Sequence, residues 1–132
     1  MLELLHVNPG SGEPIYRQLS EQIIHLIVGG QLPEETVLPS VRQMAEHLAV
    51  NPMTVSRAVK QLVEQGWLER RRGQATRVAQ RRAHQNLSAE AIIMPQLEDL
   101  LATAQQLGLS QQGLQQLIVK HWPEPRNNRE QV

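Results

Sequence analysis

Apolar residues recur at helical spacing in two segments before residue 50. The first segment follows Pro14 and ends at the pair Gly29-Gly30, a helix-stop signal. The second follows Ser40, and Gln43 three residues later completes a capping-box pattern. The predicted inner faces are Ile15, Leu19, Ile23, Leu26 and Ile27 in the first helix and Val41, Met44, Ala45 and Leu48 in the second.

A third helix is predicted over residues 51–65. Asn51 is a favoured N-cap, Pro52 suits the first turn, and Gly66 stands where helices often end. Only the tripeptide "AVN" separates this helix from the second one, which is typical of a tri-helical helix-turn-helix. The predicted buried side is Val55, Ala58, Val59 and Leu62.

After the third helix the period of the pattern changes. The runs "WLERR" and "TRVAQ" are compatible with β-strands, and the "RGQA" between them offers Gly73 for a turn. A two-stranded ribbon over residues 68–78, directly after the third helix, makes a winged helix-turn-helix. The segment before the second helix, with Pro33 and Pro39 as breakers, is predicted to be a loop.

The C-terminal part is helical in pattern after a linker-like start at Arg81 and Arg82. Gly108 divides two apolar stripes, and Pro95 either starts or kinks the first helix. Two helices with little else to pack on favour a dimer seam over an enclosed ligand pocket, although an effector site at a dimer interface stays open. The predicted seam residues are Leu97, Leu100, Leu101, Ala104, Leu107, Leu114, Leu117 and Ile118.

The fold class that follows is mainly α with a small β-ribbon. We expect a winged helix-turn-helix domain at 1–80, a helical dimerisation segment at 81–122 and a polar, frayed tail at 123–132. The chain has 132 residues, 40% hydrophobic but only 2% aromatic, and no Cys, so its core must be aliphatic. Neither a signal peptide nor a membrane-spanning run is visible, and we expect a cytoplasmic protein without a membrane partner.

The net charge of the chain is zero, but its distribution is uneven. Residues 1–41 carry −4, residues 42–82 carry +6 and residues 83–132 carry −2. A polyanion interacts with the local charge of the middle segment, and not with the net charge averaged over the whole chain. The second helix, the third helix and the ribbon make up that segment and form a candidate nucleic-acid surface.

Signals for catalysis or metal binding are weak. His25 and Glu21 stand four residues apart on a helix, which is usually a surface contact. Glu98 and Asp99 are adjacent and therefore point apart on a helix. The sequence has neither a nucleophile elbow nor a phosphate-cradling loop, so we expect no enzyme activity, no metal and no cofactor.

The polar face of the third helix carries Met53, Arg57 and Lys60, flanked by Thr54 and Ser56. A merely solvated face would look the same. Two observations favour DNA. The exposed residues lie in the N-terminal half of the helix, where a recognition helix meets base edges, and the ribbon that follows carries "RRRG".

Residues 14–78, with the strings "PIYRQLSEQI" and "LPSVRQMAEHLAVNPMTVSRAVKQLVEQG", resemble the DNA-binding domain of the GntR family of bacterial transcription regulators. The forms "LPSVRQ" and "NPMTVSRA", with a short helical C-terminus, resemble its YtrA-type subgroup. The resemblance implies a homodimeric repressor of a palindromic double-stranded DNA operator. Candidate DNA-binding residues are Ser40, Arg42, Asn51, Met53, Thr54, Ser56, Arg57, Lys60, Arg71, Arg72, Gly73, Gln74 and Arg77.

The resemblance also implies roles for some of these residues. Arg42 is expected to contact DNA at the start of the second helix, and residues 71–73 to form the wing tip. Arg57 has guanine or phosphate as its alternative partners. Asn51 either caps the helix or contacts a base, and Ser40 is a cap first.

The sequence departs from the family pattern in the wing and in the third helix. Ala75 replaces a glycine, which puts the usual wing turn in question. Arg77 replaces an apolar residue and either adds a phosphate contact or points to solvent. Pro52 and Ser56 stand where other subgroups have arginines, so the half-site sequence of those subgroups does not transfer.

Two other functions stay open at this stage. A non-specific architectural DNA-binding protein would share the basic face, and a winged-helix protein–protein module would not need one. A small-molecule effector of unknown identity also stays open.

Overall fold

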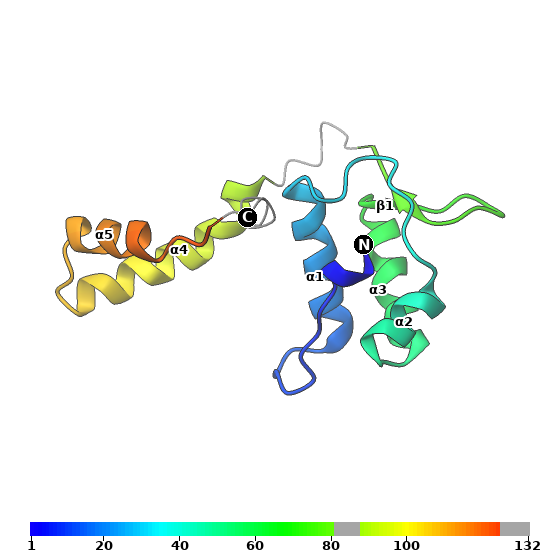
Figure 1. The fold of residues 1–132 in the computed structure, drawn as a ribbon, viewed down its shortest axis with the longest axis horizontal. Helices are drawn as coiled ribbons and strands as arrows, with labels where there is room; N and C mark the ends of the chain where they lie inside the picture. Colours follow the sequence, from blue (N-terminus) through cyan, green and yellow to red (C-terminus); the bar gives the residue numbers. More distant parts are fainter. Residues whose placement is uncertain (81–87, 125–132) are drawn as a thin grey trace, which may run out of the picture. The chain divides into compact units, whose positions relative to one another are not determined.

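The computed structural model describes residues 1–80 and 88–124, and the chain divides into two compact units, Met1–Ala89 and Glu90–Val132. The element order confirms a winged helix-turn-helix fold followed by two helices (Figure 1). The elements are η1 (Leu2–Leu4), α1 (Ile15–Val28), α2 (Val41–Leu48), α3 (Pro52–Glu64), β1 (Leu68–Glu69), β2 (Arg77–Val78), α4 (Ala89–Gln106) and α5 (Gln111–His121).

The ends of the first three helices follow the local signals in the sequence. Ser40 Oγ accepts the N–H of Gln43 at 3.0 Å, and Gln43 Oε1 accepts the N–H of Ser40 at 2.9 Å, which completes the capping box of α2. Gly66 adopts a φ of 86° just after α3, as a helix stop requires. The start of α1 differs by one residue from the prediction, because Pro14 is the N-cap and not the first helical residue.

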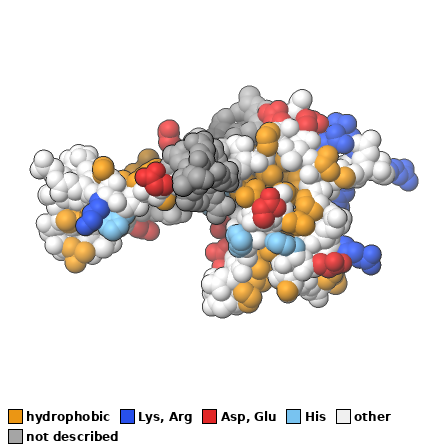
Figure 2. All heavy atoms as spheres, viewed as in Figure 1, with side chains coloured by type: hydrophobic (Ala, Val, Ile, Leu, Met, Phe, Trp, Pro, Cys, Tyr) orange, Lys and Arg blue, Asp and Glu red, His pale blue; other side chains and the backbone are white. Residues whose placement is uncertain are grey.

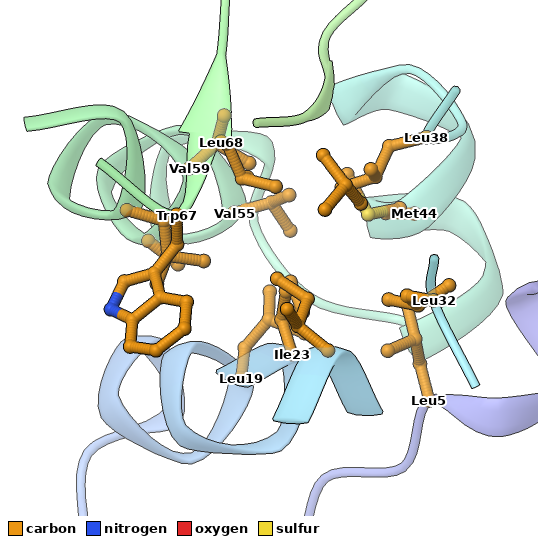
Figure 3. Close-up of a cluster of buried hydrophobic side chains, with 14 of the residues drawn as sticks. Leu5, Leu19, Ile23, Leu32, Leu38, Met44, Val55, Val59, Trp67 and Leu68 are labelled. Atoms are coloured by element: carbon orange, nitrogen blue, oxygen red, sulfur yellow. The ribbon is translucent and has the colours of Figure 1, made fainter. Parts of the chain in front are cut away.

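A hydrophobic core lies between α1, α2, α3 and β1, and it is aliphatic except for Trp67 (Figure 3). Val55 and Leu62 of α3 are 0% exposed, and Leu19 and Ile23 of α1, also 0% exposed, pack in the same cluster. Full burial of one such side chain contributes about 1.5–3 kcal/mol. The inner face predicted for α3 is confirmed at every position. Four positions predicted to face inward are only half-buried: Ile15, Leu26, Val41 and Leu48.

The segment before α1 also belongs to this core, which the sequence pattern did not indicate. Leu5 is 1% exposed. Gln22 Oε1 accepts the N–H of His6 at 2.8 Å, and Gln18 Oε1 accepts the N–H of Asn8 at 2.8 Å. These two side chains of α1 therefore hold the N-terminal arm against the helix.

The predicted ribbon is confirmed, and a third segment pairs with it. β1 runs antiparallel to β2, with Leu68 opposite Val78. The predicted loop before α2 lies along the other edge of β2, where Val37 forms a bridge with Arg77. The N–H of Val78 donates to the C=O of Thr36 at 2.8 Å. β2 is therefore paired along both of its edges, although only two short strands are regular.

The second unit leaves most of its apolar side chains in solvent. Leu100 and Leu117 are 45% and 44% exposed, and Leu107 is 78% exposed. Leu114 is half-buried. Ala104 is only 6% exposed within its own unit, so it does not present an open surface to a second copy. The small side chain is already covered by its own chain, and its place in the predicted seam stays a prediction.

The helix ends of the second unit also follow the sequence. Gly108 has a φ of 75° after α4, and the side chain of Ser110 caps α5. Pro95 lies inside α4 and does not start it. In the part of the chain that the structure describes, no helix is long and apolar enough to cross a membrane. The predicted linker-like start at Arg81 and Arg82 lies outside the described residues, as do residues 125–132 of the predicted tail.

Candidate nucleic-acid interface

The outer face of α3 is open to solvent along its whole N-terminal half. Val55 and Val59 hold the helix to the core at 0% and 1% exposure, whereas Met53 on the other side is 77% exposed. Thr54 is half-buried on the flank. The remaining exposed side chains of this face are Ser56, Arg57 and Lys60.

The polar residues at the helix starts act as caps. Asn51 Oδ1 accepts the N–H of Met53 at 2.8 Å, so the capping alternative for Asn51 is observed. Its amide nitrogen still carries two N–H donors that a base or phosphate can accept. Ser40 uses both its hydroxyl and its backbone N–H in the capping box of α2. Arg42, two residues further on, is exposed.

Arg57 lies over an aromatic ring that the sequence did not single out. Its guanidinium carbon is 3.8 Å from the centroid of the Tyr16 ring. Tyr16 is in the first turn of α1, so this contact joins α1 to the outer face of α3. Together with Lys60, Gln61 and Glu64 the pair lines a surface hollow. No pattern within one helix predicts the contact, because the two residues belong to different helices.

The turn at the wing tip is made without the missing family glycine. Gly73 has a φ of 74°, and the N–H of Gln74 donates to the C=O of Arg71 at 3.0 Å. Ala75 does not have a positive φ. The alanine therefore causes no backbone strain, and Gly73 supplies the left-handed residue of the turn.

The wing tip concentrates positive charge on the surface. Arg70, Arg71 and Arg72 are all exposed, and Arg71 forms an ion pair with Glu69. Figure 2 shows Lys and Arg side chains along the edge of this unit from which the wing projects. Among residues 1–80 and 88–124, no group of three His, Cys, Asp or Glu side chains is placed to hold a metal ion.

Arg77 has partners within the protein. Its Nη1 is 3.4 Å from Glu35 Oε2, and its Nη2 donates to Gln74 Oε1 at 3.2 Å. The side chain is 24% exposed. The alternative that Arg77 simply points to solvent is therefore wrong, because the loop before α2 brings an acid beside it. Sequence reasoning missed Glu35, which adopts a φ of 70° in that loop.

Comparison with known sequences places these features in a family context. The family model described as bacterial regulatory proteins, gntR family, matches residues 15–78. That match spans α1 to β2, the elements that carry the candidate interface. The HTH-type transcriptional repressor YtrA of Bacillus subtilis (strain 168) is 31% identical over 116 residues, which covers 87% of this chain and 89% of the relative.

Two solved structures are similar to the chain, each at 29% sequence identity. YtrA from Sulfolobus acidocaldarius, a GntR-family transcription factor, has a TM-score of 0.57 at 29% identity, covering 76% of this chain and 96% of that one. The DNA-binding domain of AraR in complex with operator ORX1 has a TM-score of 0.52 at 29% identity. That similarity covers 58% of this chain and 96% of the AraR domain.

Proposed function

The chain belongs to the gntR family of bacterial regulatory proteins, and from this premise we propose that it is a homodimeric repressor of an inverted-repeat operator. It is a DNA-binding transcription regulator and not an enzyme, and its similarity to two YtrA proteins places it in the YtrA-type subgroup. In the proposed complex α3 enters the major groove, and the wing contacts the adjacent groove or its phosphates.

The outer face of α3 is the observation that carries this proposal. Met53, Ser56, Arg57 and Lys60 stand clear of the core in the half of the helix that begins at its N-terminus. A major groove about 12 Å wide admits an α-helix, and the first turns of such a helix meet the base edges. The similar DNA-binding domain of AraR is solved in complex with operator ORX1, which supports DNA as the partner of this domain.

Affinity and specificity are proposed to come from different parts of the interface. Arg42 and the exposed arginines of the wing tip are suited to phosphates, which position a protein without reading sequence. Arg57 and the amide of Asn51 are suited to base edges, because an arginine fork matches guanine and an amide matches adenine. Binding is therefore expected to weaken with salt, while base preference is retained.

The dimer is proposed from the apolar surface of the second unit. Leu97, Leu100, Leu101, Leu107, Leu117 and Ile118 were predicted for the seam, and all six are exposed in the single chain. Exposed apolar side chains of this kind usually mark an interaction surface. On an inverted repeat, the two α3 helices of such a dimer would occupy successive major grooves, about 34 Å apart or a multiple of it.

Selection of binding sites from random duplexes with the purified protein tests the proposal. The expected result is an enriched inverted repeat that is protected in footprinting and bound by two chains in sedimentation. Binding without sequence preference across a salt titration would support an architectural protein instead. If no duplex is bound at all, the regulator proposal fails and the protein–protein module takes its place.

Substitution on the two units tests which surface meets the operator. Arg57→Ala is expected to lower operator affinity about 5- to 150-fold, because one good arginine–base contact contributes about 1–3 kcal/mol of discrimination. Lys120→Ala removes an exposed positive charge from α5 and is the matched control, with an expected change below about twofold. Equal losses for the two variants would show that the face of α3 is wrongly assigned.

A further inference from the structure

We propose that Tyr16 is a positioning residue for operator recognition, whose ring holds the Arg57 guanidinium in the orientation that reads a base. The inference rests on the proposed function and names a residue of α1, outside α2, α3 and the wing. Tyr16 is the single tyrosine of the chain, and its ring lies beneath the basic side chain at the centre of the outer face of α3.

The geometry of the contact leaves the N–H donors of the Arg57 guanidinium available for DNA. The guanidinium carbon is 3.8 Å from the ring centroid, well within the roughly 6 Å range of a cation–π interaction. Stacking occupies a face of the guanidinium, whereas its five N–H donors lie in its plane. A bidentate contact with guanine O6 and N7 uses that edge. The ring therefore restrains Arg57 without competing for the donors that DNA needs.

The platform itself is well anchored. Tyr16 is half-buried against the core, and its C=O accepts the hydroxyl of Ser20 at 2.8 Å. Leu19 and Ile23, which follow on α1, are 0% exposed, so this helix cannot move without disturbing the core. The ring thus has a fixed place relative to the backbone of α3.

Arg57 lacks a second restraint of its own. Within residues 1–80 and 88–124, no ion pair or hydrogen bond is made by its side chain. Arg71 and Arg77, in contrast, are each held by an acid. A long side chain that is restrained by a ring alone loses less conformational freedom on binding than a free one. Removing the ring should therefore weaken recognition while Arg57 is still present.

A double-mutant cycle on the operator selected by the wild-type protein tests this. The four proteins are Tyr16→Leu, Tyr16→Phe, Arg57→Ala and the double variant Tyr16→Leu/Arg57→Ala. Tyr16→Leu is expected to lower operator affinity about 3- to 30-fold, and Tyr16→Phe, which keeps the π face, by less than about twofold. The double variant is expected to bind as Arg57→Ala does, and affinity for a scrambled duplex should not change in Tyr16→Leu.

Two outcomes overturn the inference while the proposed function stands. Additive losses of Tyr16→Leu and Arg57→Ala would show that the residues act independently. A loss in Tyr16→Phe as large as in Tyr16→Leu would show that the hydroxyl, and not the ring, is used. If the wild-type protein selects no sequence at all, the proposed function itself fails, and the role of Tyr16 fails with it.

A measurement without DNA separates positioning from general stability. The ring should shift the Arg57 Hδ resonances upfield in the nuclear magnetic resonance spectrum of the full chain. The shift is expected to persist in Tyr16→Phe and to vanish in Tyr16→Leu at an unchanged urea unfolding midpoint. Unshifted Arg57 resonances in the wild-type protein would contradict the stacked arrangement in solution.

Discussion

The two units of the chain differ in how far their apolar side chains are buried. In the first, Leu19, Val55 and Leu62 are 0% exposed in one core, whereas in the second Leu107 and Val119 are each 78% exposed. The first unit has helices on several sides of its core and a strand to close it. The second has two helices with little else to cover their stripes. We infer that the first unit folds on its own contacts and the second needs a partner.

The largest expected effect is on the core of the first unit. Leu62→Ala should lower the free energy of unfolding by about 2–5 kcal/mol, because it leaves a cavity at a fully buried site. Urea unfolding in a Trp122→Phe background measures this, since Trp67 is 8% exposed and is then the sole indole. Val119→Ala, in the second unit and outside the predicted seam, is the control and should change this unfolding by less than about 0.5 kcal/mol, because Val119 is 78% exposed.

The next effect concerns association. Leu100→Asp places a charge on the exposed stripe of α4 and should raise the dimer dissociation constant at least about tenfold, since burying an unpaired charge is costly. Gln105→Asp adds the same charge at an exposed polar position of the same helix and is the matched control. Sedimentation velocity distinguishes the two variants. If the Leu100→Asp protein remains as dimeric as the control, the dimer seam does not include the exposed stripe of α4.

A smaller effect separates capping from contact at Asn51. Asn51→Ala should lower the free energy of unfolding by about 1 kcal/mol, because the N–H of Met53 loses its acceptor. Asn51→Ser retains an oxygen for the cap but removes the amide. If Asn51→Ser keeps both stability and base preference in a binding-site selection, Asn51 is a cap only. An altered base preference at unchanged stability would assign the amide to DNA.

The smallest expected effect distinguishes two arginines of the wing. Arg72→Ala should reduce the slope of log affinity against log salt by about one, as the loss of one phosphate contact does. Arg77→Ala should leave that slope unchanged, because Arg77 is turned toward Glu35 and Gln74. Arg77→Ala should lower the free energy of unfolding by less than about 1 kcal/mol, because the ion pair that it removes is partly exposed. Equal slopes of log affinity against log salt for the two variants would show that Arg77 also contacts DNA.

The sequence predicted best where the determining residue lies close to the feature it determines. Ser40 with Gln43, Asn51 and Gly66 each set a helix end within a few residues, and the period of the apolar residues set the inner face of α3. Such local signals were sufficient for the helix-turn-helix. They also placed the ribbon, because its turn depends on Gly73.

Contacts between distant segments could not be predicted in the same way. The stack of Arg57 on Tyr16 depends on how α1 packs against α3. The pair formed by Arg77 and Glu35 depends on a loop that pairs with β2. The burial of Leu5 depends on the path of the N-terminal arm. None of these contacts has a periodic signature, so only the folded chain reveals them.

The pairing of the loop before α2 with β2 limits how the wing can respond to DNA. Leu38 donates its N–H to the C=O of Thr76 at 2.9 Å, and Glu35 donates to the C=O of Val78 at 2.9 Å. The same loop leads directly into Ser40 and Arg42, so the wing and the start of α2 form one stiff piece. If both parts contact phosphates as proposed, the distance between those contacts is fixed before DNA binds. In the proposed complex the protein would measure groove width, and operators would differ in affinity through their shape as well as their bases.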